Sequence, residues 1–395
     1  MDGFRKKTVR DADVQGQTVL LRVDFNVKVQ DGKITEDARV RAALPTIEYL
    51  ISREAALIII SHLGRPKGVA DKKYSLKPVA ELLRQFLGRP VLFAGGCLGA
   101  AVEKQAAALC PGQILMLENL RFHEEEEEND PVFAGQLAKL ADIYVDDAFG
   151  MAHRAHASNE GVAEYLPAYA GLLLESEMNS LSKALDGQER PVVAVIGGAK
   201  VSDKIGMIKN LLDKVDKLLI GGGMANTFLA AQGCDMQGSA VEEDRLPWIK
   251  ELLCGETAAK LVLPADVVAA EAFTADSAHK TVKPRDIPAG WLALDIGPAT
   301  RQIFADEIAK ARTVVWNGPV GVFEMEPFAA GTMAVAQAVA DSGAYSVVGG
   351  GDSIAAVNQA QVAEKISFIS TGGGAMLKFL EGKKLPGVAA LENIN

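Results

Sequence analysis

Residues 192–220 have the sequence VVAVIGGAKVSDKIGMIKNLLDKVDKLLI. An apolar, β-branched run at 192–196 stops at the turn GGAKVSDK, a helical stretch follows, and a second apolar run begins at 217. This alternation is typical of βα units in a parallel sheet, whose strands are buried on both faces and therefore appear as continuous apolar runs.

The same pattern recurs along the whole chain. In the second half, further apolar runs end in glycine-rich turns: KLLI at 217–220 before GGGMAN, TVVW at 313–316 before NGPVG, YSVV at 345–348 before GGGDS, and ISFIS at 366–370 before TGGGA. In the first half, the runs end in arginine and histidine: LLRVDFNV from 20, ALIIISHLGR from 56, ILMLENLRFH from 114, and DIYVDDAFGMAHR from 142. Ligands of open parallel sheets bind beyond the carboxyl ends of the strands. We therefore predict two chemically different surfaces, one suited to a phosphate chain and the other to a small anion.

The length of the chain indicates two lobes. Its 395 residues exceed the roughly 250 to 300 that one hydrophobic core organises. We predict an α/β fold with two Rossmann-like lobes, each a parallel sheet covered by helices. The stretch LLLESEMNSLSKALD at 172–186 has amphipathic spacing and precedes Gly187, which predicts a connecting helix. The expected division is 1–171 for the first lobe, 172–186 for the connecting hinge helix and 187–380 for the second lobe.

Composition restricts the class of protein. The chain has 23% charged residues and no apolar run long enough for a membrane helix, and its first residues do not resemble a signal peptide or a lipidation motif. The four cysteines are scattered without a zinc pattern, so we expect them to be reduced. A net charge of -10 argues against nucleic-acid binding. These features predict a cytoplasmic protein with no membrane or nucleic-acid partner, whose anionic substrates are held by a local cluster of Arg and Lys.

The glycine-rich turns of the second half favour a nucleotide. Glycine lets the backbone approach a phosphate, and the N–H groups at a helix start supply positive potential. Any one such turn is weak evidence, but five occur in this half. Neither a P-loop motif nor a complete dinucleotide-binding motif is present. Lys200 and Lys204 lie four residues apart, on adjacent turns if a helix begins near Val201, and a lysine at that end opposes the helix dipole unless an anion is bound.

Two carboxylates of the second half have alternative interpretations. Asp352 follows three glycines at an expected helix start, where an N-cap role is the simpler interpretation. Beside a nucleotide it is the best candidate ligand for Mg²⁺, which takes one or two carboxylates and completes its shell with phosphates and water. Glu324 is either a ribose acceptor or an ordinary exposed glutamate.

Polar residues of the first half point to a small anion. Alternation in RVDFNV places Arg22, Asp24 and Asn26 on one face. Polar residues are anomalous in a covered sheet, so Asp24 and Asn26 either form a turn or reach a polar cavity where they bind a substrate hydroxyl, and we favour the cavity. Four arginines follow the predicted strands, and their convergence is costly unless an anion lies among them: Arg39, Arg65, Arg121 and Arg154. Less diagnostic histidines accompany them: His62, His123, His153 and His156. We interpret the acidic run 124–128 as a solvated loop or helix start without a direct role.

In chain order, nine motifs closely resemble the phosphoglycerate kinase family: RVDFNV (22–27), SHLGRP (61–66), NLRFH (119–123), DAFGMAHRAH (147–156), GGAKVSDK (197–204), GGGMANTF (221–228), WNGPVGVFE (316–324), GGGDS (349–353) and STGGGA (370–375). The resemblance covers almost the whole chain. It implies a carboxyl-group phosphotransferase of glycolysis, acting on 1,3-bisphosphoglycerate and Mg-ADP to give 3-phosphoglycerate and Mg-ATP, and a monomer. It also implies that the tail from about 381 to 395 packs on the first lobe.

The resemblance assigns roles to particular residues. It implies phosphoglycerate binding by Asp24, Asn26, Arg39, His62, Arg65, Arg121 and Arg154. It implies nucleotide binding by Lys200, Lys204, Gly222, Asn317, Glu324, Gly350, Gly351, Asp352 and Ser353, with Asp352 on the metal. For transfer we expect Arg39, Lys200 and the N–H groups at Gly351 and Gly373 to stabilise the moving phosphoryl group. Two departures from the family pattern, Lys28 in place of Pro and Ser353 in place of Thr, leave these assignments intact.

Two other classes of function compete with this interpretation. An oxidoreductase with two Rossmann halves is disfavoured by the missing dinucleotide motif and by the surplus of phosphate-seeking arginines, and a fluorescence titration with NAD would detect it. A non-catalytic scaffold would be favoured only if key site residues were lost, and none is.

Overall fold

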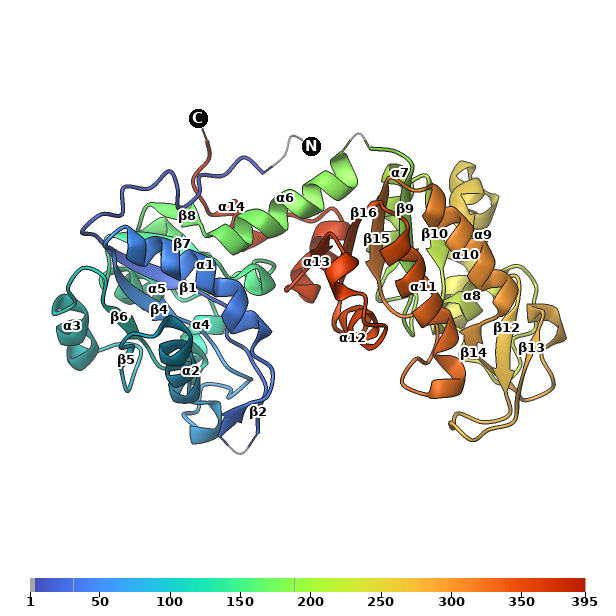
Figure 1. The fold of residues 1–395 in the computed structure, drawn as a ribbon, viewed down its shortest axis with the longest axis horizontal. Coiled ribbons are helices and arrows are strands. Elements are labelled where there is room, and N and C mark those ends of the chain that lie inside the picture. The colour runs from blue at the N-terminus through green and yellow to red at the C-terminus, as the bar shows by residue number, and fades with distance from the viewer. Residues whose placement is uncertain (1–3, 31, 188, 395) are drawn as a thin grey trace. The chain divides into compact units, whose positions relative to one another are not determined.

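The computed structural model describes residues 4–30, 32–187 and 189–394, which form two compact units. Of the described residues, those up to Asn179 and those from Lys384 on form the first unit, and those from Ser180 to Lys383 form the second unit. Both units have the α/β architecture that the sequence predicts (Figure 1).

The first unit is built on a six-stranded parallel sheet. Its strands lie in the order β5-β6-β4-β1-β7-β8, with the bounds β1 (Thr18–Arg22), β4 (Ala56–Ile60), β5 (Leu92–Phe93), β6 (Ile114–Met116), β7 (Ile143–Asp146) and β8 (Ala168–Ala170). The helices of this unit are α1 (Ala38–Ser52), α2 (Lys77–Leu87), α3 (Ala100–Ala107), α4 (Glu124–Glu127) and α5 (Pro131–Ala138), and a small hairpin pairs β2 (Val29–Gln30) with β3 (Lys33–Ile34).

Alternation along the strands places the core of the first unit. Val19 and Leu21 of β1 join one fully buried cluster with Ile47 and Leu50 of α1, whereas Leu20 is equally buried but lies outside that cluster. Successive strand side chains point to opposite faces. Both faces of the sheet are therefore covered, which explains the unbroken apolar runs in the sequence.

The second unit contains another six-stranded parallel sheet, in the order β11-β10-β9-β15-β16-β17. The strands are β9 (Val192–Ile196), β10 (Lys217–Ile220), β11 (Leu261–Val262), β15 (Thr313–Asn317), β16 (Tyr345–Gly349) and β17 (Phe368–Ile369). The helices are α7 (Ile205–Lys214), α8 (Gly223–Ala231), α9 (Leu246–Cys254), α10 (Pro298–Lys310), α11 (Ala330–Asp341), α12 (Gly351–Gln359) and α13 (Gly373–Leu380). By chain order the sheet is 3-2-1-4-5-6, the Rossmann arrangement, which binds ligands where the strand order reverses. Here that point lies between β9 and β15.

A second, antiparallel sheet of this unit was not predicted. It consists of β12 (Val267–Ala270), β13 (His279–Val282) and β14 (Leu292–Ile296), with β12 in the middle.

The predicted connecting helix is α6 (Leu172–Asp186). The division between the units falls inside it, between Asn179 and Ser180. Its first turn is held in the first unit, because Oδ1 of Asp147 accepts hydrogen bonds from the N–H groups of Leu173 (2.8 Å) and Leu174 (3.2 Å). Burial raises the pKa of this Asp147 carboxyl to about 6.

The C-terminal segment contains the short helix α14 (Pro386–Ala389) and pairs with the first unit. The N–H of Lys7 donates to the carbonyl of Glu392 (2.8 Å), and the N–H of Glu392 donates to the carbonyl of Ala168 (3.0 Å). Glu381, by contrast, pairs with Lys378 and Lys383, so residues 381–383 belong with the second unit.

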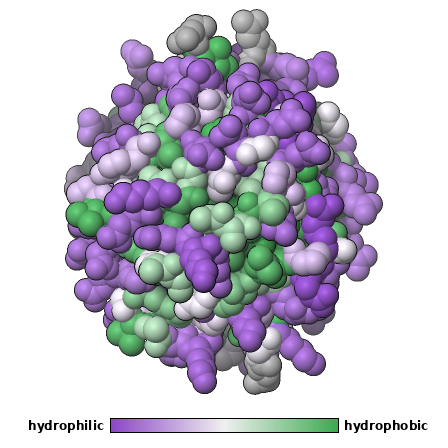
Figure 2. All heavy atoms as spheres, turned by 90° about the vertical axis from the view of Figure 1, so that its left-hand side faces the viewer, coloured by the Kyte–Doolittle hydropathy of each residue, from purple (hydrophilic) through white to green (hydrophobic). Residues whose placement is uncertain are grey.

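Hydrophilic side chains cover most of the face shown in Figure 2. The large exposed hydrophobic side chains of the first unit are far apart in the sequence: Val69, Leu92, Val132, Tyr165 and Ile394. No helix among the described residues is both long and apolar enough to cross a membrane.

Candidate active site

The chain leaves the first sheet at Arg22, so the prediction of a strand through RVDFNV was wrong. The alternation nevertheless persists for five residues, because Val23, Phe25 and Val27 are buried while Asp24 is partly exposed and Asn26 is exposed. Arg22 does not share their surface, since its side chain is fully buried. Asp24 and Asn26 therefore reach the polar edge of the sheet.

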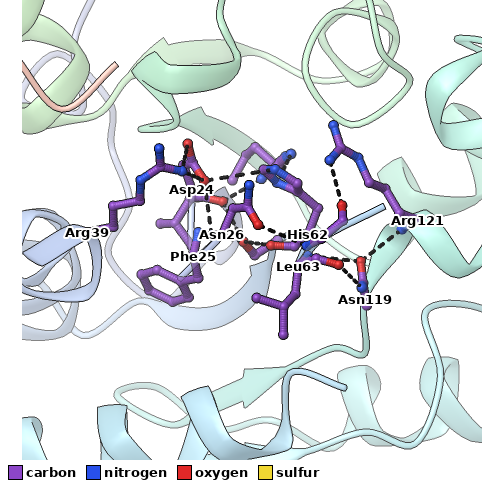
Figure 3. Close-up of polar contacts among 12 residues, drawn as sticks. Asp24, Phe25, Asn26, Arg39, His62, Leu63, Asn119 and Arg121 are labelled. Atoms are coloured by element: carbon purple, nitrogen blue, oxygen red, sulfur yellow. Dashed lines mark hydrogen bonds and ion pairs between the residues drawn. The ribbon is translucent and has the colours of Figure 1, made fainter. Parts of the chain in front are cut away.

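Asp24 organises this edge (Figure 3). Nη1 of Arg39, from the first turn of α1, lies 2.8 Å from both carboxylate oxygens of Asp24. Oδ1 of Asp24 also accepts the N–H of Asn26 (3.1 Å) and lies 3.9 Å from Nε2 of His62. A cation, a carboxylate and an imidazole thus meet at one point beyond β1 and β4.

Hydrogen bonds from neighbouring side chains hold the loop after β4 next to Asp24 and Asn26 (Figure 3). Oδ1 of Asn26 accepts the N–H of Gly64 (2.8 Å), and Nη1 of Arg121 donates to the carbonyl of Gly64 (2.8 Å). Asn119 accepts the N–H of Leu63 (3.2 Å) and donates to its carbonyl (2.7 Å). The loop that carries the next residue, Arg65, is therefore held in place.

The predicted arginines differ in exposure. Arg121 is buried and pairs through Nε with Glu127 (3.0 Å), and burial lowers its pKa. Arg65 and Arg154 have exposed side chains on loops of the same unit. The structure thus places Arg39 on Asp24 and Arg121 on the carbonyl of Gly64, and it leaves the side chains of Arg65 and Arg154 at the surface.

His62 is buried beside positive charge. Burial, followed by the charges of Arg22, Arg121 and Arg39, holds its pKa well below the usual value, so the ring is neutral at pH 7. Of the other histidines, His156 is buried, whereas His123 and His153 are half-buried.

The interpretation of residues 124–128 as a solvated run was wrong for one member. Glu126 is fully buried and accepts hydrogen bonds from Ser158. No pattern within the run distinguishes it from its neighbours, because its partners lie 32 residues further along the chain.

The second group of candidate residues surrounds the turn after β9. Helix α7 begins at Ile205 and not near Val201, the start on which the adjacent-turn placement of Lys200 and Lys204 depended. The carboxylate of Glu242 accepts the N–H groups of Val201 (2.5 Å) and Ser202 (3.1 Å) and fixes an irregular turn there. Lys200 is exposed on this turn. Its charge is therefore free to reach an anion.

Lys204 occupies the N-cap position of α7 without capping it by its side chain, and it is less exposed than Lys200. Its Nζ donates to Oδ1 of Asn317, whose Nδ2 donates to the carbonyl of Gly349 (2.8 Å). Burial lowers the pKa of Lys204 to about 8, although the charges of Asp203 and Asp352 act in the opposite direction. Partial burial of an amine costs stability, and it lowers the pKa toward neutral pH. Such an amine is well suited to bind an anion, which would restore its charged form.

Three glycine turns come together at the carboxyl edge of this sheet. Gly318 has φ +97°, and a Cβ there would lie 2.3 Å from the carbonyl oxygen of Gly197. A Cβ at Gly222 (φ +70°) would lie 2.8 Å from backbone atoms of Gly198 and Pro319. Only glycine allows these backbones to pack, so the turns after β9, β10 and β15 form one continuous floor.

Two helix starts adjoin this floor. Gly351 begins α12 and Gly373 begins α13, and a Cβ at Gly373 would lie 3.4 Å from Cα of Gly350. Their first N–H groups and dipoles give this region positive potential.

Asp352 is the second residue of α12 and is exposed, so the N-cap interpretation was wrong and Gly350 occupies that position. The hydroxyl of Ser353 is buried and accepts the N–H of Gly318 (2.6 Å). This side chain therefore stabilises the turn after β15 and faces away from solvent, leaving only its backbone N–H for a ligand.

A cavity of about 490 Å³ opens beside these turns. Volumes of this size suit a small ligand. Its polar side contains Gly198, Gly222, Asn226, Glu324 and Asp352. Its apolar wall contains residues that sequence reasoning missed, since they belong to the unpredicted antiparallel sheet and nearby loops: Phe273, Leu292, Leu294 and Val322.

Among the described residues, no cluster of three or more His, Cys, Asp or Glu side chains is arranged to hold a metal ion. Asp352 lies in the first turn of α12 at the rim of the cavity, and its charge reaches Lys204. This single carboxylate does not build a metal cage, but it fits Mg²⁺ that arrives with phosphates and keeps several waters.

Comparisons with known proteins find relatives that match this chain over nearly its whole length. Residues 9–383 match the family model described as phosphoglycerate kinase. The chain is 59% identical to a phosphoglycerate kinase of Moorella thermoacetica, over 98% of this chain and 99% of the relative, and 57% identical to one of Chloroflexus aurantiacus, over 99% and 100%. It is also similar to the solved structures of phosphoglycerate kinase from Coxiella burnetii (TM-score 0.90, 43% identity, 98% of each chain) and Pyrococcus horikoshii (TM-score 0.84, 35% identity, 98% of each chain).

Proposed function

Because the chain belongs to the phosphoglycerate kinase family, we propose how its two units divide that family's reaction. The reaction is the glycolytic transfer of a phosphoryl group between a phosphoglycerate acyl phosphate and the phosphate tail of ADP, and the substrates are small molecules. The observation that carries the division is the pair of dissimilar strand-end surfaces. One presents arginines and a neutral histidine around Asp24, and the other presents glycine turns, lysines and helix starts.

The first unit binds phosphoglycerate. Arg39 and His62 face the same Asp24 carboxylate, which places a charged donor and a neutral group at one edge. Guanidinium groups match carboxylate and phosphate oxygens. Asp24 and Asn26 serve the substrate hydroxyl, and Arg39, His62, Arg65, Arg121 and Arg154 serve its anionic groups.

The second unit binds the nucleotide. The cavity bounded by Leu292, Leu294 and Val322 takes the base, and Glu324, on the same rim, accepts from the ribose. Lys200, Lys204 and Asn317 bind the phosphates together with the N–H groups of Gly350–Ser353 and the backbone at Gly222. Apolar walls with a few convergent polar groups are usual for such sites.

Asp352 would hold Mg²⁺ through its exposed carboxylate, at the edge of the cavity. When bound, the ion neutralises phosphate charge and orients the oxygens.

The chain's own residues then need to supply only position and charge. In the ATP-consuming direction the acceptor is a carboxylate, ionised at neutral pH, so no general base is required. The moving phosphoryl group carries charge on its equatorial oxygens. We assign Arg39, Lys200 and the N–H groups at Gly351 and Gly373 to stabilise that charge during in-line transfer.

Arg39 belongs to the first unit and Lys200 to the second. For both to act on one phosphoryl group the units must close, so we assign the hinge to α6 and its flanking loops. Small-angle scattering with both substrates should show compaction relative to the free protein, and unchanged dimensions would contradict the hinge.

We also place the protein in the cytoplasm as a monomer. Cys110 and Cys254 are exposed free thiols, which suit a reducing compartment. Each proposed half-site draws its residues from one unit of one chain. Light scattering should therefore give the mass of a single chain.

A coupled assay with Mg-ATP and 3-phosphoglycerate tests the function directly. We expect turnover that depends on both substrates, and a folded protein without turnover would contradict the assignment. The rival oxidoreductase interpretation predicts NAD binding in a fluorescence titration, where we expect none.

A further inference from the structure

Behind the proposed phosphoglycerate site lies a connected group of buried polar side chains. Glu126, Ser158 and Arg22 have no exposed surface, and His62 is 1% exposed. They come from α4, the segment after His156, the end of β1 and the loop after β4. Buried polar groups of this kind are costly unless they are hydrogen-bonded to one another.

The directions of the hydrogen bonds in this group are fixed by chemistry. Nε of Arg22 lies 2.8 Å from Oγ of Ser158, and a guanidinium only donates. Ser158 must therefore accept from Arg22, and its single proton goes to Oε1 of Glu126, 2.6 Å away. Oε2 of Glu126 accepts the N–H of Ser158 (2.9 Å), so both oxygens of Glu126 act as acceptors.

The hydrogen bonds of Arg22 also determine which ring nitrogen of His62 carries the proton. Nη2 of Arg22 lies 3.2 Å from Nδ1 of His62, and Nη1 of Arg22 is anchored on the carbonyl of Val23. Since Nη2 cannot accept, Nδ1 must be the acceptor, and the proton of the neutral ring is on Nε2. Nε2 is the atom that faces Asp24, at 3.9 Å from Oδ1.

The charges around the ring favour its neutral form. Arg22, Arg39, Arg121 and His156 all oppose a second proton on His62, and Asp24 is the facing carboxylate. The neutral ring of His62 can thus donate its N–H close to these guanidinium groups without adding a further positive charge. Figure 3 shows His62 between Asp24 and Arg121 in this arrangement.

We propose that Glu126, Ser158 and Arg22 are positioning residues that hold His62 in its Nε2–H tautomer and aim that N–H at an oxygen of bound phosphoglycerate. The statement about the substrate rests on the function proposed above. The tautomer depends only on hydrogen bonds within the first unit. Neither Glu126 nor Ser158 touches the substrate in this account, since both are fully buried.

Nitrogen-15 NMR of the histidine-labelled full chain tests the tautomer, because the two ring nitrogens give different signals when one carries the proton. In the wild type we expect His62, assigned by its loss in His62→Gln, to carry its proton on Nε2 at neutral pH. A proton on Nδ1 in the wild type would overturn the proposal without any need for a variant.

Two variants test the chain of contacts. Glu126→Gln replaces one acceptor oxygen by an NH₂ donor, which cannot accept from Ser158, and Ser158→Ala removes the link to Arg22. In both we expect a mixture of His62 tautomers and a rise of about tenfold in KM for 3-phosphoglycerate, with KM for ATP unchanged. The matched control is Glu125→Gln, which changes an exposed neighbour in the same run and should alter neither quantity.

The outcomes separate the two levels of the proposal. If both folded variants keep the wild-type tautomer and the wild-type KM for 3-phosphoglycerate, the positioning role is refuted. If the tautomer changes in the variants but 3-phosphoglycerate leaves the wild-type His62 signals unmoved, the positioning stands and the assignment of His62 to the substrate fails.

Discussion

Arg39 and Asp24 form a forked ion pair, in which one guanidinium nitrogen lies 2.8 Å from both carboxylate oxygens. The Asp24 side chain is 12% exposed, so the pair is screened less than an ordinary surface pair. Asp24 therefore both orients Arg39 and remains accessible to a substrate hydroxyl.

Replacing this carboxylate should weaken one substrate selectively. In Asp24→Asn we expect KM for 3-phosphoglycerate to rise by about tenfold or more, because a charged acceptor for Arg39 and the substrate is lost, while KM for ATP stays unchanged. Asp37→Asn is the matched control, since Asp37 pairs with Arg41 at the exposed start of the same helix. Equal effects of the two variants would refute a specific role for Asp24.

Binding of the nucleotide should weaken in mild alkali. The pKa of Lys204 is lowered to about 8 by burial, so the side chain is charged below that pH and neutral above it. We expect kcat/KM for ATP to be constant below about pH 8 and to fall above it, since this ratio reports the free enzyme. Lys204→Arg keeps its charge and should remove the decline. The same alkaline decline in both proteins would exclude Lys204 as its source.

The glycine floor of the second unit can be tested with a matched pair of substitutions. Gly318 (φ +97°) and Gly233 (φ +87°) share the left-handed backbone, but a Cβ at Gly233 meets nothing within 4 Å while one at Gly318 meets the Gly197 carbonyl. Gly233→Ala should cost about 1–2 kcal/mol of stability and leave KM for ATP unchanged. Gly318→Ala should cost at least about 3 kcal/mol and raise that KM. Similar losses measured by urea unfolding would argue against the close approach.

Asp295 should make stability depend on pH. It is buried, its Oδ2 accepts the N–H of Gly331 (2.7 Å), and burial raises its pKa to about 7. A raised carboxyl pKa contributes stability that is complete below the unfolded pKa of about 4 and is lost as pH rises through the folded pKa.

In Asp295→Asn this loss should be absent. The stability advantage of the variant over the wild type should therefore grow by about 1.4 kcal/mol per pH unit between about pH 5 and pH 7 and level off above it. Urea unfolding of both proteins across this range measures the difference. A constant difference would mean that the carboxyl does not titrate there.

The sequence predicted the parts of the fold that local burial determines. Strands β9 and β10 have the predicted bounds, and β15 and β16 differ from theirs by one residue, because doubly covered strands leave an unbroken apolar run between glycine turns. Asp24 and Arg39, 15 residues apart in the chain, form an ion pair beyond the end of β1, a contact that no sequence pattern indicated.

The features that the sequence did not predict depend on residues far away in the chain. The irregular turn at Val201, before the start of α7, is fixed by Glu242, 41 residues away. Glu126 belongs to a run of five glutamates, which predicts a solvated segment. Its burial depends on Ser158, which is distant in the sequence and hydrogen-bonds to it. The antiparallel strands β12–β14 are short and lie among long irregular segments, so the apolar wall of the cavity had no periodic signal.

The most direct measurement is the steady-state rate of the coupled assay for the wild type, Arg39→Ala and Lys200→Ala, with folding checked by circular dichroism. If both residues stabilise the moving phosphoryl group, each variant should stay folded and lose at least about a hundredfold in kcat. Folded variants that keep the wild-type kcat and change only KM would contradict the assignment of Arg39 and Lys200 to the transfer step.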